Sequence, residues 1–281
     1  MKIGIIGLGL MGASFAKTLK KIGGYSVYGL DNSSQVMLKA ELMGIIDEPL
    51  NENNASMLDM LIISVYPRSF SEISEKFVPL LKSGAIVTDF CGIKRDIIVK
   101  MKELSLKYPN VTFIGGHPMA GREFSGIDRS VSTLFEKASM ILCNVNADIF
   151  CLDKVKQFYL SLGFSEVVIT SAEFHDKAIA YTSQLCHIVS NAFIKNEIAS
   201  EHFGYSAGSY KDLTRVARLN PEMWAELMID NSDNLNKELT ELISNLTLYK
   251  EALSSKDENK LKQLLFSGNE RKLFIDSRTK K

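Results

Sequence analysis

The chain has 281 residues, enough for about two domains of ordinary size. Hydrophobic residues make up 46% of it and charged residues 23%, which is usual for a packed protein and argues against disorder. The 33 Lys and Arg residues balance the 33 Asp and Glu residues, so the net charge gives no general attraction to nucleic acid or to an anionic membrane.

The cysteines indicate the setting in which the chain works. The four of them are scattered and form no C-x-x-C pair: Cys91, Cys143, Cys151 and Cys186. Such spacing favours neither a zinc site nor a disulfide framework, so we expect no metal and a reducing, cytoplasmic location. The N-terminal segment lacks the pattern of an export signal, and no apolar stretch is long enough to cross a bilayer.

Strands and helices are predicted to alternate over the first 170 residues. The expected strands are Lys2–Gly7, Ser26–Leu30, Leu61–Val65, Ala85–Asp89, Val111–Ile114, Ser139–Cys143 and Glu166–Ile169. The expected helices between them are Leu10–Ile22, Ser34–Met43, Phe70–Leu81, Lys94–Leu106 and Ala147–Leu162. This alternation predicts an α/β fold with a parallel, doubly wound sheet.

The pattern changes near Thr170. The segment Thr170–Glu173 (TSAE) matches a capping box, which starts a helix by satisfying its free N–H groups. No further strand is indicated after it, and apolar residues such as Leu235, Leu239 and Leu246 recur at helical spacing. We therefore predict two domains, an α/β domain over residues 1–170 and an all-helical domain over residues 171–281.

A glycine-rich turn joins the first strand to the first helix. It reads Gly7, Leu8, Gly9, Leu10, Met11 and Gly12. The three glycines suit a tight turn, close approach of a pyrophosphate and close packing of helix on strand, as in a Rossmann-type dinucleotide site. Asp31, at the end of the second strand, has the spacing of the acid that binds a ribose 2′-hydroxyl, which favours NAD over NADP. A plain glycine-rich turn and a flavin site are the alternatives.

Two segments follow strand ends at the carboxyl edge of the predicted sheet, where such folds bind ligands. One holds His117 between glycines, in Gly115–Gly121 (GGHPMAG), and a histidine there can take a hydroxyl proton near neutral pH. A loop histidine bonded to the backbone is the alternative. The other segment holds Asp89, which could cap the next helix, and Lys94, which could be a helix-face charge.

The helical region offers further polar candidates. Ser183 and His187 lie four residues apart and so share a helix face, either in a pocket or as a core histidine bonded to a serine. Lys211, Arg215 and Arg218 also fall on one face and could hold a carboxylated substrate, with Arg215 as a bidentate clamp. The alternative is a solvated charged face.

Taken together, these segments resemble the prephenate/arogenate dehydrogenase family of tyrosine biosynthesis. The matching elements run in order from residue 4 to about 231: GLGLMG at 7–12, Thr88–Asp89 with Lys94, GHPMAG at 116–121 with Glu123, Ser183 with His187, and Lys211, Asp212, Thr214, Arg215, Pro221, Met223, Trp224 and Asn231. The segments around His117 and from Lys211 to Trp224 are the specific ones.

The resemblance implies an NAD-dependent oxidative decarboxylation of prephenate to 4-hydroxyphenylpyruvate, or the corresponding reaction of arogenate. It implies that His117 accepts the ring hydroxyl proton and that Arg215 binds a substrate carboxylate. It implies that His187 and Ser183 line the pocket, that Glu123 and Lys211 form a gating pair, and that Trp224 lies near the site across a homodimer. The helical domain would then be the dimerisation domain.

Three positions depart from the family pattern. Gly92 stands where some relatives have a serine beside the catalytic histidine, Cys186 replaces a proline, and Leu219 replaces a serine. These departures concern substrate contacts. Two other classes stay open: a β-hydroxyacid or 6-phosphogluconate-type dehydrogenase using Lys177 or Lys195, and a non-catalytic NAD-binding protein.

Overall fold

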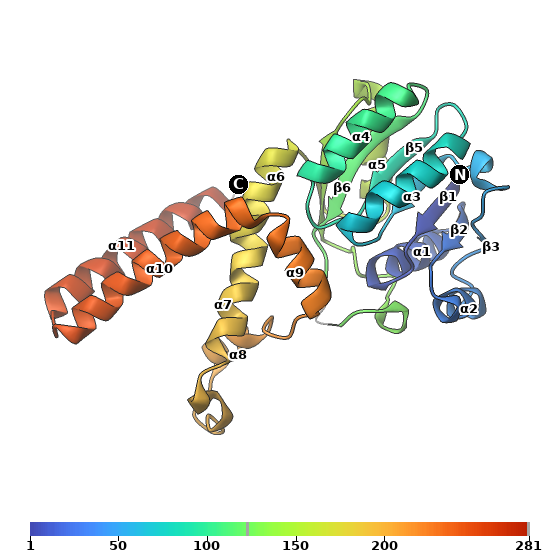
Figure 1. Ribbon diagram of the computed structural model, residues 1–281. Coiled ribbons are helices and arrows are strands. Elements are labelled where there is room, and N and C mark those ends of the chain that lie inside the picture. Colours follow the sequence, from blue (N-terminus) through green and yellow to red (C-terminus); the bar gives the residue numbers. More distant parts are fainter. Residues whose placement is uncertain (122–123, 280–281) are drawn as a thin grey trace. The chain divides into compact units, whose positions relative to one another are not determined.

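The computed structural model describes residues 1–121 and 124–279, and contacts divide it into two units, Met1–Asn231 and Ser232–Lys281 (Figure 1). The first unit is built on one eight-stranded sheet with the strand order β3-β2-β1-β4-β5-β6-β7-β8. The strands are β1 Lys2–Ile6, β2 Ser26–Leu30, β3 Glu48–Pro49, β4 Met60–Ile63, β5 Ile86–Asp89, β6 Thr112–Pro118, β7 Ser139–Asn144 and β8 Glu166–Ile169.

All neighbouring strands are parallel except β6 and β7, which are antiparallel. The predicted doubly wound sheet is therefore confirmed, while the reversal at β7 and the short strand β3 were not predicted. An antiparallel pair needs no crossover helix. Accordingly, the described part of the connection from β6 to β7 contains the helical turn Ile127–Arg129 and no longer helix.

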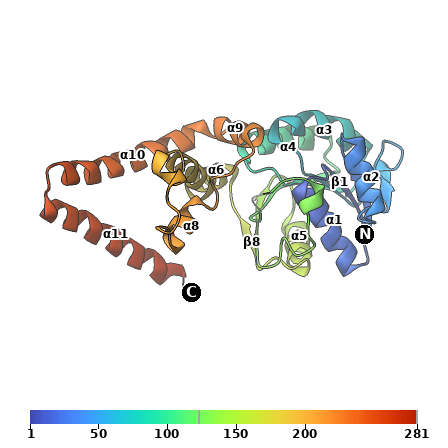
Figure 2. The same ribbon diagram turned by 90° about the horizontal axis from the view of Figure 1, so that it is seen from below.

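Two layers of helices cover the sheet because successive residues of a strand point to opposite faces and those of β1 and β4 are buried on both. Ile3 and Ile5 of β1 belong to a buried cluster with residues of α1 (Leu10–Ile22) and α5 (Ile149–Ser161). Ile63 of β4 belongs to a second cluster with residues of α3 (Phe70–Phe77) and α4 (Arg95–Lys107). Figure 2 shows these two pairs of helices on opposite faces of the sheet. The helix α2 spans Ser34–Leu42, one residue shorter than predicted, and the predicted cap at Ser33 is confirmed.

The chain leaves β8 into a continuous helical stretch. It consists of α6 (Ala172–Ile179), the π-helical turns Ala180–Leu185 and α7 (Cys186–Phe193). Ser171 caps α6 by accepting the N–H of Phe174 at 3.1 Å. The predicted box placed the cap at Thr170, but the N–H of Thr170 still bonds to Leu142 of the sheet at 3.0 Å. Helices α8 (Gly208–Thr214) and α9 (Pro221–Ile229) complete the first unit.

The second unit is a hairpin of two helices, α10 (Ser232–Ser254) and α11 (Glu258–Thr279). The hydroxyl of Tyr249 donates to the carbonyl of Leu264 at 3.3 Å, and Lys260 pairs with Glu251 at 3.2 Å. The described residues from 171 to 279 contain no strand, as expected. Because contacts group α6 to α9 with the sheet, the domain boundary at residue 170 stays a prediction. Among the described residues, no helix combines the length and apolarity needed to span a membrane.

Candidate active site

The turn from β1 into α1 has the shape that a bound pyrophosphate needs. A Cβ added at Gly12 would lie 1.9 Å from the carbonyl oxygen of Gly7, so only glycine lets α1 pack this closely on the loop. At Gly9 an added Cβ would meet nothing within 4 Å, which leaves the loop open on that side. No side chain caps α1 at Gly9, and its first turn carries no acidic residue. The first N–H groups, at Leu10, Met11 and Gly12, are thus available to an anion.

Asp31 lies where β2 ends, next to this loop. One of its carboxylate oxygens accepts the N–H of Leu8 at 2.8 Å, and the other accepts the N–H of Ser33 at 3.0 Å. These bonds hold the carboxylate at the mouth of the glycine turn and leave lone pairs for a ribose hydroxyl. The described residues of the loop and Asp31 therefore fit the phosphates and ribose of a dinucleotide.

His117 is the second-last residue of β6, at the same edge of the sheet as the glycine turn. The residue is half-buried, and its Nδ1 lies 2.8 Å from Nε2 of His175 in α6. Nδ1 of His175 lies 2.6 Å from Oδ1 of Asp176. Both His175 and Asp176 are 1% exposed. A histidine that the sequence singled out thus stands at the outer end of a buried hydrogen-bonded chain.

Asp176 is held by the beginning of α4. Its carboxylate accepts the backbone N–H of Lys94 at 2.7 Å and of Arg95 at 2.9 Å, and the Nε of Arg95 lies 3.3 Å away. Burial opposes ionisation of Asp176, but the bonds from His175 and from these amides outweigh it and lower its pKa. Asp176 therefore satisfies the first N–H groups of α4, a role for which the sequence had offered Asp89 as a candidate.

Asp89 instead forms a buried ion pair with Lys94. The Lys94 amine donates to the Asp89 carboxylate, to the carbonyl of Cys91 at 2.8 Å and to that of Ile93 at 3.0 Å. Lys94 is 0% exposed, so the prediction of a helix-face charge is wrong. Asp89 also accepts the N–H of Gly116 at 2.9 Å. The pair therefore fixes the strand immediately before His117.

The environment keeps both histidines neutral near pH 7. Burial holds the pKa of His117 well below its ordinary value of 6.5, and repulsion from His175 and Lys94 lowers it further. Burial also lowers the pKa of His175, although its bond to Asp176 works in the opposite direction. A neutral imidazole at the sheet edge can accept a proton.

A second group of predicted residues gathers on the helices. Nδ1 of His187 lies 3.1 Å from the carbonyl oxygen of Val216. In the described part of the chain no hydrogen bond joins its ring to Ser183, the pairing that was one alternative. The rings of His187 and Trp224 are 4.0 Å apart between centroids. Burial lowers the pKa of His187, the bond to Val216 works in the opposite direction, and the charge of Arg215 lowers it further. Ser183 is partly exposed within the π-helical turns.

The predicted basic stripe does not form on one helix. Lys211 lies on α8, but α8 has only seven residues and ends at Thr214, so Arg215 follows its last residue and Arg218 lies beyond it. A turn bonded from Ala217 to Thr214 redirects the chain there. Glu123, the predicted partner of Lys211, lies outside the described residues.

Several buried polar residues were not singled out as site residues by the sequence reasoning. Asn231 is 0% exposed, donates to the carbonyl of Asp176 at 2.9 Å and to Oε1 of Gln184 at 2.8 Å, and accepts from Arg95 at 3.2 Å. It therefore ties α6 to the start of α4. The only available signal for His175 and Asp176 was an adjacent His-Asp pair in a chain with four histidines.

The departure at Gly92 has a structural counterpart. A Cβ added there would lie 3.1 Å from Cδ2 of Leu227, closer than most real contacts. Leu227 of α9 thus occupies the space that a side chain at position 92 would need. A serine at this place would require Leu227 to move.

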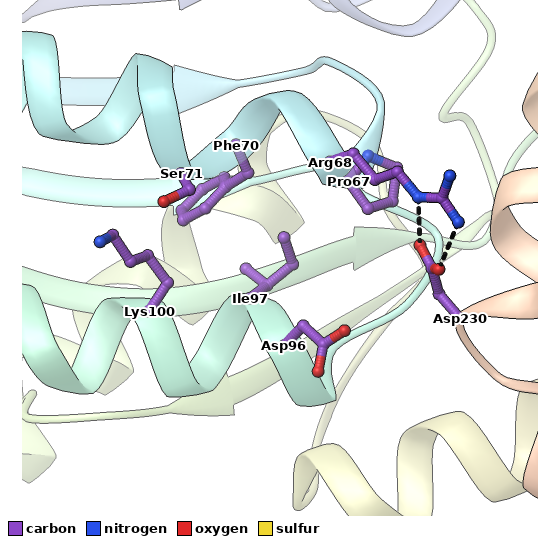
Figure 3. Close-up of a pocket in the computed structure, with 8 residues that line it drawn as sticks. All are labelled: Pro67, Arg68, Phe70, Ser71, Asp96, Ile97, Lys100 and Asp230. Carbon is purple, nitrogen blue, oxygen red and sulfur yellow. Dashed lines mark hydrogen bonds and ion pairs between the residues drawn. The ribbon is translucent and has the colours of Figure 1, made fainter.

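A separate small cavity of about 190 Å³ lies between the β4–α3 connection and α4 (Figure 3). Arg68 closes one end of it through bonds to Asp230 at 2.8 Å and 3.4 Å, and the backbone N–H of Arg68 donates to Glu226 at 2.8 Å. Its lining residues include none of the candidate active-site residues. This cavity lies where Arg68 contacts Glu226 of α9 and Asp230, and it is not the candidate active site.

A nucleotide-binding sheet with a neutral histidine at its carboxyl edge is the architecture of a dinucleotide-dependent oxidoreductase. Two family models match the chain: the nucleotide-binding domain of prephenate dehydrogenase over residues 15–168, and the dimerization domain of prephenate dehydrogenase over residues 171–267. The chain therefore belongs to the prephenate dehydrogenase family. The first match begins after the glycine turn, so the description of that turn rests on its geometry.

Individual relatives agree with the family. The cyclohexadienyl dehydrogenase of Zymomonas mobilis is 28% identical over 91% of this chain and 89% of its own length. A prephenate dehydrogenase of A. aeolicus, solved with hydroxyphenyl propionate and NAD⁺, is 30% identical with a TM-score of 0.84 and 98% of each chain covered. An arogenate dehydrogenase of Synechocystis is 27% identical with a TM-score of 0.80, covering 98% of this chain and all (100%) of its own.

Proposed function

We propose that this chain catalyses the NAD-dependent oxidative decarboxylation of prephenate to 4-hydroxyphenylpyruvate. The observation that carries the proposal is the neutral His117 at the sheet edge that also carries the glycine turn, backed by the buried His175 and Asp176. The NAD⁺ and hydroxyphenyl propionate bound to the A. aeolicus relative support the choice of cofactor and of a ring-bearing acid. Asp31 supports NAD over NADP because a carboxylate repels a 2′-phosphate.

His117 is the proposed general base. It accepts the hydrogen bond of the ring hydroxyl and takes its proton as the carbon–hydrogen bond at the same carbon breaks. NAD⁺ bound at the glycine turn supplies the hydride acceptor. As CO₂ leaves and the ring becomes aromatic, His117 returns the proton to the phenolic oxygen, so the step consumes no net proton.

The residues around His187 are the proposed substrate-binding set. Arg215 binds a carboxylate of the substrate, because its guanidinium can hold both carboxylate oxygens at once. His187, Ser183 and Trp224 line the pocket in this proposal. Lys211, exposed on α8, and Glu123 are proposed as a charged pair at the entrance, although Glu123 lies outside the described residues.

Arogenate is the second candidate substrate. The names of the Synechocystis and Zymomonas relatives favour it, since one is an arogenate and the other a cyclohexadienyl dehydrogenase. Both substrates carry the same ring and differ at the side chain that bears the amino or keto group. The reaction at His117 is the same for either.

An NADH-absorbance assay with prephenate and arogenate, each with NAD⁺ and NADP⁺, tests the proposal directly. We expect turnover of prephenate with NAD⁺ and a loss of about 10²–10⁴-fold in kcat for His117→Ala, the usual scale for a general base. Absence of turnover on both substrates would end the proposal. Full activity of His117→Ala would remove His117 from the mechanism.

We also propose a homodimer with two domains, 1–170 for the nucleotide and 171–281 for substrate and dimerisation. The dimerization-domain match supports this, as do the exposed apolar side chains of α10 and α11: Ile243, Leu246, Leu253, Leu265, Phe266, Leu273, Phe274 and Ile275. A monomer in a sedimentation experiment would refute the proposed dimer.

We propose a cytoplasmic location as well, and the four free thiols support it.

A further inference from the structure

Two hydrogen bonds connect Asp176, His175 and His117. Which atom donates in each bond follows from the chemistry of the three side chains. We infer that His175 and Asp176 are positioning residues that hold His117 in the tautomer with a proton on Nδ1 and a lone pair on Nε2. This inference rests on the proposed role of His117 as the base.

Asp176 is the acceptor of the first bond, because its carboxylate is ionised. Its carboxylate accepts two backbone N–H groups at the first turn of α4 and the side chain of Arg95, all of which stabilise the ionised form. An ionised carboxylate only accepts hydrogen bonds. The 2.6 Å contact to Nδ1 of His175 therefore requires a proton on that nitrogen.

His175 donates to Asp176 and accepts from His117. Its ring is 1% exposed, and a neutral imidazole carries only one ring proton. With that proton on Nδ1, Nε2 of His175 is an acceptor. The 2.8 Å contact to His117 is then made by the Nδ1–H of His117, which leaves the lone pair of His117 on Nε2.

The same two hydrogen bonds stabilise His117 when it takes a proton. The positive charge that forms on His117 is bonded to His175, and the negative carboxylate lies at the other end of His175. The charge of Lys94 opposes protonation of His117, but it lies in an ion pair with the Asp89 carboxylate. A preorganised arrangement of this kind lowers the free energy of the protonated base without any movement of the protein.

Two substitutions of His175 separate positioning from packing. The side-chain oxygen of His175→Gln can still accept from His117, whereas His175→Met fills a similar volume and accepts nothing. We expect His175→Gln to keep kcat within about tenfold of wild type, and His175→Met to lose about 10²–10³-fold with little change in KM. Equal losses in both variants, or losses confined to KM, would overturn the inference.

A direct measurement needs neither substrate nor a substitution of His175. Nitrogen-15 NMR of histidine-labelled protein reports which ring nitrogen carries the proton, and with four histidines His117 is assigned by the signal lost in His117→Asn. We expect Nδ1 of His117 to be protonated and Nε2 not to be. A protonated Nε2 would overturn the inference. Because the spectrum is independent of turnover, a failed prephenate assay would sink the proposed function alone.

Discussion

The buried pair of Lys94 and Asp89 allows a quantitative prediction. Replacing Lys94 by Met keeps most of the apolar stem but removes an amine that is 0% exposed and bonded to one carboxylate and two carbonyl groups. The substitution leaves the Asp89 carboxylate buried, and among the described residues its remaining backbone donors are the N–H groups of Cys91 and Gly116. Breaking one partner of a buried pair costs about 3–5 kcal/mol, and we expect Lys94→Met to lose that much stability.

Urea unfolding followed by the fluorescence of Trp224 measures this loss. Trp224 is the only tryptophan and belongs to the same unit as Lys94. The control is Lys100→Met, on the helix α4 that follows Lys94, because Lys100 pairs with the exposed Glu75 and surface pairs contribute little. The reasoning fails if both variants unfold at the wild-type urea concentration, or if the control loses as much as Lys94→Met.

Three further predictions concern the cofactor, the substrate and pH. Gly9→Ala should weaken NAD⁺ binding in calorimetry with little change in melting temperature, whereas Gly12→Ala should lower both, because its Cβ would strike the Gly7 carbonyl; equal melting temperatures would contradict this. Arg215→Ala should mainly raise KM for the substrate, and an unchanged KM would leave Arg215 a surface charge. Burial depresses the pKa of His117 and of His175, so the unfolded chain binds more protons than the folded one at about pH 6. The melting temperature should therefore fall as the pH drops through about 6.5. A melting temperature that stays constant from about pH 7.5 to about pH 5.5 would contradict this.

Local patterns predicted the elements whose sequence is periodic. The helix Leu10–Ile22 and the strands Ser26–Leu30 and Glu166–Ile169 have the predicted bounds. The strand β3 was missed because it has two exposed residues, one of them a proline, and so carries no alternation. The π-helical turns were missed because one extra residue per turn leaves no mark in an apolar pattern.

In the candidate site, too, the sequence predicted residues that stand in a local pattern and missed those that only the fold brings together. His117 was found because glycines flank it after a strand, but His175 lies 58 residues away from it in the sequence. Asp176 is 82 residues from the Lys94 amide that it caps. Lys94 was assigned to the surface because a lysine at a helix start is normally solvated. Only the fold supplies the buried carboxylate that makes the opposite placement stable.

Asn231 shows why these distant residues hold one arrangement. A buried amide with one acceptor and two donor hydrogens can be satisfied in few ways, and Asn231 uses its groups on Arg95, on the carbonyl of Asp176 and on Gln184. Arg95 also bonds to the Asp176 carboxylate. The beginning of α4 and the helix that carries His175 are thus joined by bonds at both the side chain and the backbone of Asp176. The orientation of His117 therefore depends on contacts with Asn231, which lies 55 residues from Asp176 in the sequence, too far apart for a local pattern to connect them.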